Sequence, residues 1–181
     1  ISGVRAKEKS PITFTNVSKA QIAPRNLGQD IPILLNYLPS VVTSTDAGAG
    51  IGYTSMRVRG SDGSRINVTL NGVPFNDSES QGTYFVNLPD FASSLESIQL
   101  QRGVGTSTSG AGAFGASLNL QTKASQQNGY AEIANSLGSF GTRKHTLAFG
   151  TGLHHNFEMN ARISKIESGG YIDRAYTNLF G

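Results

Sequence analysis

The chain has no cysteine and no tryptophan, and charged residues make up only 15% of its 181 residues. Without cysteine the fold cannot depend on disulfides, which fits any compartment in which disulfides are not needed. The formal charge of +3 is spread along the chain, and the basic pairs Arg57 with Arg59 and Arg143 with Lys144 do not extend into a run. Because nucleic-acid binding requires a concentrated basic surface, we expect no nucleic-acid partner.

Long hydrophobic runs are also absent. The most apolar stretch, IPILLNYL at 31–38, is far shorter than the ~20 residues that a membrane-spanning helix requires. We therefore expect no helical membrane span. The sequence also lacks an initiator methionine and a charged leader followed by an apolar segment, so we expect it to begin inside a longer precursor or after processing.

Glycine, by contrast, is abundant at 22 residues, and Ser, Thr and Asn are plentiful, which is typical of a β-rich, loop-rich protein. The stretch GAGAFG at 110–115 has the glycine spacing of a dinucleotide-binding fingerprint. However, it follows a polar loop and precedes a segment in which Leu118 and Leu120 alternate with polar residues. Because a strand and not a helix follows, we reject a nucleotide site and interpret the glycines as allowing close backbone approach.

Periodicity and turn signals predict a mixed α+β unit over residues 10–123. Strands are expected at 10–17, 55–60, 65–70, 97–103 and 116–122, with a hairpin turn at Asn71-Gly72. Ser18 is expected to cap a short helix through Ile22. A second helix is expected to begin at Asp30 and end at Pro39, and a third to lie within 88–97 with Phe91 and Leu95 on one face. Exposed loops are expected at 43–55 and 75–85.

Beyond Gln126 the pattern changes to longer alternating strands, expected at 130–137, 145–150 and 156–165. Strands of about ten residues with alternating polarity are typical of a transmembrane β-barrel, although an amphipathic soluble meander fits the pattern equally well. Three strands cannot close into a barrel and would leave open edges. Either the chain is a fragment, or its barrel strands are completed elsewhere.

Two long segments in order, MRVRGSDGSRINVTLNGVPFND at 56–77 and LPDFASSLESIQLQRGVGTSTSGAGAFGASLNLQTK at 88–123, resemble the plug domain of TonB-dependent outer-membrane receptors. The resemblance rests on a strand ending in Arg-Gly, the Asn-Gly-Val turn, a second Arg-Gly strand, and the glycine-rich return to a strand ending in Thr-Lys. Ala116 stands where members often have a second glycine, and the coupling box expected upstream is not recognisable in residues 1–9.

The resemblance implies an α+β plug domain, with a mixed four- to five-stranded sheet and short helices, followed by the first antiparallel strands of a transmembrane β-barrel. It places the plug at 1–126, with its compact part at 10–123, and the incomplete barrel at 127–181. It implies active uptake across the bacterial outer membrane, with no catalysis and no cofactor. The implied partners are a TonB-type energy-coupling protein, the rest of the β-barrel, and a small-molecule or oligosaccharide ligand whose identity stays open among siderophore, vitamin, haem and glycan.

The resemblance also suggests site residues. The loops at 43–55 and 75–85 match apical loops that face the outside, and loops carry binding residues disproportionately. They offer as candidate ligand-binding residues Asp46, Tyr53, Asn76, Asp77, Glu79, Gln81 and Tyr84. Arg59 and Arg102 each precede a glycine and match positions that pair with barrel glutamates, which implies a lock between plug and barrel.

Other chemistry is weakly supported. The adjacent His154 and His155 lie in an expected turn between strands, where neighbouring side chains should point apart, so we expect no metal site. Only three histidines exist, and no Ser, His and Asp arrangement suggests a nucleophile. The competing hypothesis is a soluble β-rich adhesin or glycan-binding module that uses the same loops.

Overall fold

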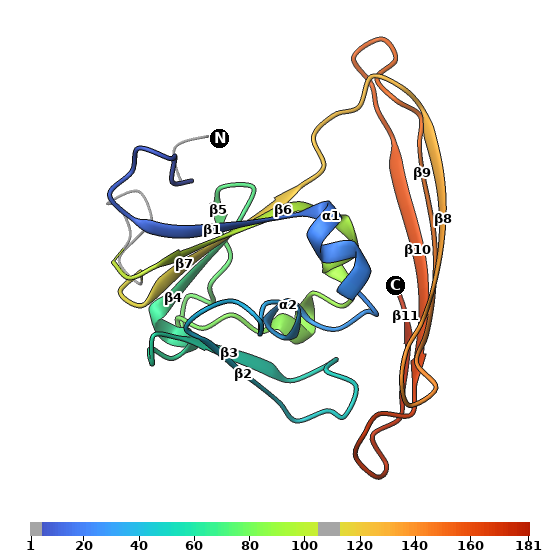
Figure 1. Cartoon of the computed structure of the whole chain (residues 1–181). Coiled ribbons are helices and arrows are strands. Elements are labelled where there is room, and N and C mark those ends of the chain that lie inside the picture. The colour runs from blue at the N-terminus through green and yellow to red at the C-terminus, as the bar shows by residue number, and fades with distance from the viewer. Residues whose placement is uncertain (1–4, 105–112) are drawn as a thin grey trace.

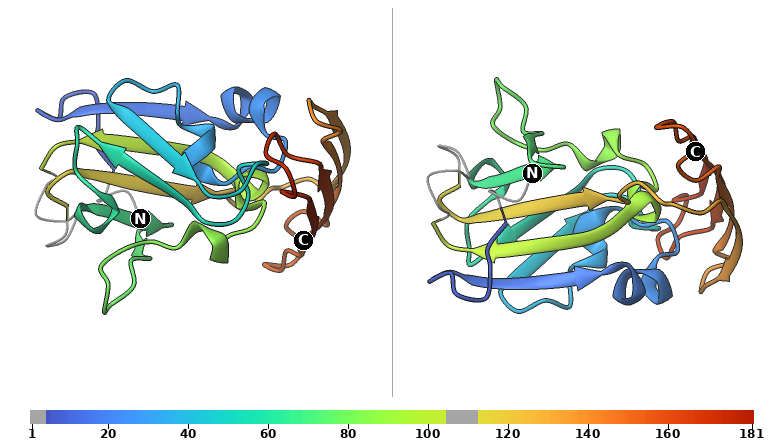
Figure 2. Two further views of the ribbon diagram at one scale, coloured as in Figure 1. Left: turned by 90° about the horizontal axis from the view of Figure 1, so that it is seen from below. Right: turned by 90° about the horizontal axis from the view of Figure 1, so that it is seen from above.

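The computed structural model describes residues 5–104 and 113–181. Figure 1 shows a compact unit of short helices and two sheets beside a separate, tall antiparallel sheet, which we call the wall sheet. The expected combination of a mixed sheet with short helices, followed by antiparallel strands, is confirmed. The two views in Figure 2 show the wall sheet on one side of the compact unit, with the first helices of the chain near it.

The compact unit is built on a five-stranded mixed sheet in the order β1-β6-β7-β4-β5. The strands are β1 (Thr13–Ser18), β4 (Ile66–Leu70), β5 (Val73–Pro74), β6 (Leu95–Arg102) and β7 (Ala116–Thr122). All neighbouring pairs are antiparallel except β4 and β7. The predicted hairpin turn is confirmed, since Asn71 and Gly72 both have positive φ, 51° and 83°.

The two faces of this sheet are covered differently. Ile98, Leu100 and Leu118 are completely buried in the main apolar core. The intervening Gln99 and Asn119 are buried as well. The carboxamide of Gln99 accepts from the Ala6 N–H at 2.7 Å and donates to the Ala6 carbonyl at 3.0 Å, so the chain before β1 lies on the polar face.

The helices are shorter than expected. The cap prediction at Ser18 is confirmed by α1 (Lys19–Ile22), which η1 (Ala23–Arg25) follows. The helix predicted to run from Asp30 to Pro39 is wrong, because α2 covers only Ile31–Leu34 and tighter turns continue to Leu38. Its apolar side chains are buried as the spacing suggested, but the amides bond to carbonyls three residues back, as Leu38 N–H does to Leu35.

Two further expectations need correction. The loop predicted at 43–55 is shorter than expected, because β2 (Val41–Thr45) and β3 (Thr54–Val58) form a hairpin that takes up both of its ends and leaves 46–53 as the loop. β-branched residues dominate β2, and this favours a strand over the coil that the glycines suggested. The helix predicted within 88–97 is only a 3₁₀ turn, η4 (Phe91–Ser94), because Leu95 already pairs with β7. Two further 3₁₀ turns are η2 (Gly63–Arg65) and η3 (Phe85–Asn87).

The wall sheet has the order β11-β10-β9-β8. Its strands are β8 (Tyr130–Leu137), β9 (Arg143–Gly150), β10 (Asn160–Ser168) and β11 (Thr177–Phe180). The predicted strand at 156–165 starts too early, because His155 and Asn156 form a tight turn with positive φ. The fourth strand was not predicted, and the described strands do not close into a ring.

Side chains alternate across the wall sheet. Ile133, Leu147 and Ile163 are exposed on the face away from the compact unit, whereas Lys144 and Ile166 are buried against it. Because of this alternation, the side chains of Lys144 in β9 and Arg162 in β10 point toward the compact unit. Within the described residues, no helix is both long and apolar enough to cross a membrane.

Candidate functional site

The two predicted apical loops come together at a pocket of about 250 Å³. Three of the predicted ligand-binding residues line it, namely Asp46 and Tyr53 from the β2–β3 hairpin and Tyr84 from the loop before η3. The remaining lining residues are Ser44, Thr54, Ser55, Thr83, Phe85 and Val86. Tyr53 and Tyr84 are 69% and 50% exposed, so both rings present apolar faces and hydroxyls to a visiting molecule.

The other four predicted residues do not line this pocket. Asn76 holds its loop in place, since its side chain accepts from the Val68 N–H at 2.7 Å and donates to the carbonyls of Ile66 and Gln81. The carboxylate of Asp77 accepts from the backbone and hydroxyl of Ser80 and from the Glu79 N–H. These hydrogen bonds, first those of Ser80, lower the pKa of Asp77. Asn76 and Asp77 thus organise the loop.

The remaining two positions extend this loop. The Gln81 side chain donates to the Ser78 carbonyl at 2.9 Å, and its backbone has a positive φ of 58°. Glu79 is exposed. The structure therefore divides the seven residues into three that line the pocket and four that lie in the adjoining loop.

A buried aspartate bonds to one of the residues that line the pocket. Asp30 occupies the N-cap position of α2, as expected, but its side chain makes no cap hydrogen bond. It accepts instead from the Gly52 N–H at 3.0 Å and from the Thr54 hydroxyl at 2.9 Å, and thereby joins α2 to the β2–β3 hairpin. Burial raises the pKa of Asp30, and these two hydrogen bonds oppose the rise.

The two predicted lock arginines lie next to each other. Arg102 is buried, with Nε donating to the Pro39 carbonyl at 3.0 Å and Nη1 to the Thr15 hydroxyl at 2.9 Å. Its buried Nη2 has no hydrogen-bond partner in the part of the chain that the structure describes. Arg59 Nη1 lies 3.5 Å from the Arg102 carbonyl. Burial, and secondly the charge of Arg59, lowers the pKa of Arg102, and no described carboxylate pairs with either guanidinium.

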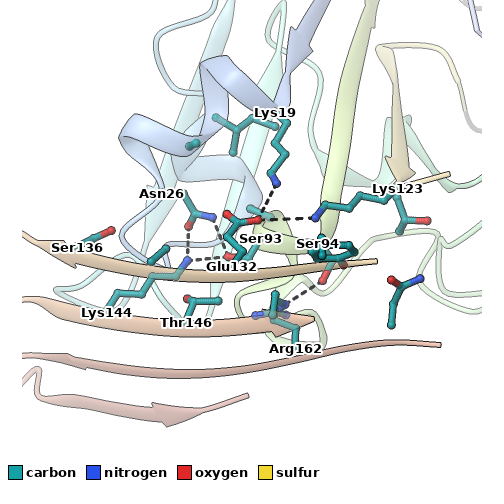
Figure 3. Close-up of a pocket in the computed structure, with 18 of the residues that line it drawn as sticks. Lys19, Asn26, Ser93, Ser94, Lys123, Glu132, Ser136, Lys144, Thr146 and Arg162 are labelled. Carbon is teal, nitrogen blue, oxygen red and sulfur yellow. Dashed lines mark hydrogen bonds and ion pairs between the residues drawn. The ribbon is translucent and has the colours of Figure 1, made fainter. Parts of the chain in front are cut away.

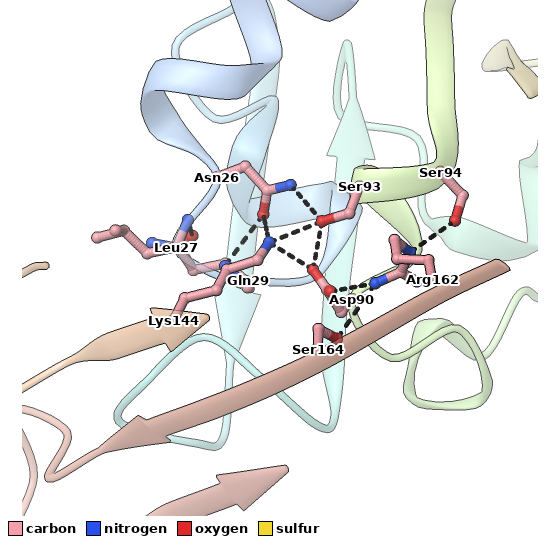
Figure 4. Close-up of polar contacts among 10 residues, drawn as sticks. Asn26, Leu27, Gln29, Asp90, Ser93, Ser94, Lys144, Arg162 and Ser164 are labelled. Carbon is pink, nitrogen blue, oxygen red and sulfur yellow. Dashed lines mark hydrogen bonds and ion pairs between the residues drawn. The ribbon is translucent and has the colours of Figure 1, made fainter. Parts of the chain in front are cut away.

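A buried charge cluster that the sequence did not predict joins the compact unit to the wall sheet (Figure 4). The carboxylate of Asp90 binds Lys144 Nζ of β9 at 2.6 Å and Arg162 Nη1 of β10 at 2.5 Å. Burial alone would raise the pKa of Asp90, but the charge and hydrogen bonds of Lys144, with the hydroxyls of Ser93 and Ser164, hold it below its usual value. The signal was present in the alternation, which places Lys144 and Arg162 opposite the apolar face of their strands.

Beside this cluster, a cavity of about 540 Å³ separates α1 and η4 from the inner face of the wall sheet (Figure 3). Glu132 of β8 lies 3.4 Å from Lys19 Nζ and 3.9 Å from Lys123 Nζ across this space. These side chains are partly exposed, so the two ion pairs contribute little to stability. The wall side is also lined by small residues such as Ala134, Ser136 and Ala148.

The histidine pair and Gly115 of the glycine-rich stretch lie outside the pocket. The prediction that His154 and His155 point apart is wrong, since their rings lie edge to face at 4.3 Å because His155 adopts a positive φ. Among the described residues, no group of three or more His, Cys, Asp or Glu could hold a metal. Of the GAGAFG stretch, Gly110 and Gly112 lie outside the described residues, while a Cβ at Gly115 would lie 2.4 Å from the Ser61 Cβ, which supports close packing there.

Comparison with known proteins adds independent information. The vitamin B12 transporter BtuB of Vibrio cholerae is 24% identical over 173 residues, which cover 94% of this chain and 28% of that protein. The chain thus spans little more than a quarter of these curated relatives. Among solved structures, the copper transporter OprC has a TM-score of 0.69 at 16% identity, covering 96% of this chain and 27% of the other. FpvA of P. aeruginosa, bound to a heterologous pyoverdine with iron, has a TM-score of 0.68 at 15% identity, covering 88% and 21%.

The family model described as the TonB-dependent receptor plug domain matches residues 6–117. This match runs from the segment on the polar sheet face to the start of β7, and includes both loops of the pocket and both lock arginines. Because it covers more than half of the sequence, the chain belongs to the family of TonB-dependent receptor plug domains.

Proposed function

We propose that this chain is the plug and the first wall strands of a TonB-dependent outer-membrane transporter, which binds a scarce solute at the outer face and gates its energised import into the periplasm. In this proposal, residues 1–126 form the plug and 127–181 belong to a β-barrel that other parts of the protein complete. The resident partners are the rest of that barrel, the outer membrane and a TonB-type energy-coupling protein.

The observation that carries the proposal is the pocket shared by the two apical loops. Asp46 and Tyr53 reach it from one loop and Tyr84 from another, more than 30 positions away in the sequence. Two half-exposed tyrosines beside a carboxylate form a surface that can contact a ligand through ring faces and polar atoms together. The solute itself is a small molecule or an oligosaccharide.

The proposal excludes catalysis by the chain. The proteins that it resembles are transporters and receptors. Their names state vitamin B12 and copper as transported solutes, and these are properties of those proteins. For this chain the same site chemistry supports solute capture without a reaction.

Growth-limited uptake screening tests the proposal. Cells that express the full-length protein, and cells that lack it, would be grown on limiting siderophores, haem, cobalamin and oligosaccharides. We expect one class of solute to support growth only with the protein and only while the energy-coupling complex is intact. Full-length protein that is extracted without detergent, with no heat-modifiable migration, would instead favour the soluble adhesin.

A further inference from the structure

The charged groups of the Asp90 cluster have several hydrogen-bond partners within the protein. Lys144 Nζ has three N–H donors and three acceptors, namely Asn26 Oδ1 at 3.0 Å, Asp90 Oδ1 at 2.6 Å and the Ser93 hydroxyl at 2.7 Å. Asp90 is completely buried, and Lys144 is 4% exposed. A single ammonium group therefore joins the end of η1, the turn before η4 and the wall strand β9.

The second cation binds the same carboxylate from the neighbouring strand. Besides its contact with Asp90, Arg162 donates from Nε to the Ser94 hydroxyl at 3.1 Å and from Nη1 to the Ser164 hydroxyl at 3.2 Å. Asp90 itself has a positive φ of 49°, an uncommon conformation for a residue with a side chain. The backbone is thus strained at Asp90, the residue whose carboxylate contacts both wall strands.

Close apolar contacts border the cluster along the same seam. Ile166 of β10 is fully buried, and a Cβ at Gly28 would lie 2.4 Å from its Cδ1 atom. Just after β8, the chain also passes close to the plug, since a Cβ at Gly138 would lie 2.6 Å from Leu27 Cδ1. Low solvent exposure strengthens the attraction between Asp90 and its two cations and makes the loss of either side costly.

The other polar contacts across the seam are weaker. Lys19 and Lys123 reach Glu132 with partly exposed side chains, and the Tyr171 N–H donates to the Gly48 carbonyl at 3.2 Å. Partly exposed ion pairs contribute little to stability, and the backbone hydrogen bond carries no charge. Among the described contacts, the Asp90 cluster is thus the strongest candidate for holding the plug in register with the wall.

We propose that Asp90, Lys144 and Arg162 form a charge-dependent anchor that positions the α1–η4 corner of the plug on strands β9 and β10 and keeps this seam closed. Its polarity is the reverse of the expected arginine lock, because the acid lies on the plug and the bases lie on the wall. The proposal rests on the proposed function only in taking the wall sheet as part of the complete receptor. Asp90 is a positioning residue and contacts no solute.

Cysteine labelling of the full-length receptor tests this anchor, because this part of the chain has no native cysteine. An Ile166→Cys reporter is covered by the plug corner, and a Met56→Cys reporter lies inside the plug core. In the otherwise unchanged receptor, a water-soluble maleimide should label both slowly. Asp90→Asn should raise the labelling rate at position 166 by tenfold or more and leave that at position 56 unchanged, which means that the corner lifts while the plug stays folded.

Two outcomes would overturn the proposal. An unchanged rate at position 166 would mean that the cluster does not hold the seam, and an equal rise at both positions would mean that Asp90 only stabilises the plug itself. Should Asp90→Asn prevent folding, Lys144→Met leaves the pair of Asp90 with Arg162 and should raise the rate at position 166 several-fold. The labelling needs no transport, so its failure is separate from a negative uptake screen.

Discussion

The Thr54 hydroxyl donates a 2.9 Å hydrogen bond to the carboxylate of Asp30, across 24 positions of sequence. Because burial raises the pKa of Asp30, the folded state binds its proton more tightly than the unfolded state does. This carboxyl should therefore add stability as pH falls from the raised value toward the ordinary value of about 3.9. We predict that Asp30→Asn removes this gain, measured as the difference between wild-type and variant melting temperatures from pH 7 to pH 4.

Asp90 should respond to acid in the opposite direction. Its pKa is held low by Lys144, so its contribution is fully present above the ordinary value and is lost as pH falls through the depressed folded value. Lys144 and Arg162 are the charged groups that face it. We predict that Asp90→Asn destabilises the receptor at neutral pH by about 3 to 5 kcal/mol, since it leaves two cations without their anion. Denaturant titration should show the difference shrinking in strong acid; a constant difference would contradict the assignment.

The pocket predicts a graded response to substitution in the apical loops. Tyr53→Ala and Tyr84→Ala remove rings that line it, and tyrosines at binding surfaces commonly contribute more than about 1 kcal/mol each. We expect each to weaken binding of the solute identified by uptake screening by roughly tenfold or more. Glu79→Ala is the matched control from the adjoining exposed loop, and equal losses in all three variants would place the ligand outside the pocket.

The contact between Gly28 and Ile166 predicts a steric effect. Gly28 has a φ of 99°, and any Cβ there would meet Ile166 at 2.4 Å. Gly28→Ala combines an unfavourable backbone with overpacking and should destabilise the seam by about 1 to 3 kcal/mol. Gly63→Ala is the control, because no atom lies within 4 Å of a Cβ at that position and its φ is not positive. Thermal unfolding of the two full-length variants compares them directly.

Strand periodicity and turn chemistry were sufficient to predict most of the fold. Ile98 and Leu100 alternate with glutamines along β6, and Asn71-Gly72 directly specifies the hairpin of β4 and β5. The helix expected to reach Pro39 failed because apolar residues spaced three and four apart also suit successive tight turns. The periodicity of apolar residues predicts which face of an element is buried more reliably than it predicts whether the backbone forms α-helical or 3₁₀ hydrogen bonds.

The candidate site was harder to predict, since it depends on distant parts of the chain. The loops of the pocket were identified, but nothing local distinguishes Tyr84, which lines the pocket, from Asp77, whose carboxylate binds its own loop. Asp90 meets cations that are 54 and 72 positions later in the sequence. Such pairings follow from how the wall sheet packs on the plug, which the periodicity of a single strand does not specify.

The proposed boundary between plug and wall predicts a pattern of proteolysis. Residues 10–123 contain the main core, whereas β8–β11 leave unpaired edges within the described chain. In the isolated fragment, limited proteolysis should therefore cut first beyond Gln126 and leave the earlier part intact. Even cleavage across both halves, or a protected second half, would show that the boundary lies elsewhere.

The adjacent arginines support a final prediction about retention of the plug in the complete receptor. Arg102 is buried beside Arg59, and neither has a carboxylate partner among the described residues, so the resemblance to the family suggests that barrel glutamates complete the site. Arg59→Ala and Arg102→Ala should each leave such a carboxylate without its partner. Where water is excluded, this loss should destabilise the plug in its barrel by about 3 to 5 kcal/mol. Arg102→Ala should have the larger effect, because it also removes the hydrogen bonds to Pro39 and Thr15.

Single-molecule pulling on the plug N-terminus, beside a ligand titration, separates retention from recognition. Both variants should lower the unfolding force and leave ligand affinity unchanged, because neither arginine lines the pocket of the apical loops. Arg57→Ala is the matched control, since Arg57 is exposed on the same strand-to-loop segment. An unchanged force together with lost binding would assign the two arginines to the ligand site, and the lock would have to be abandoned.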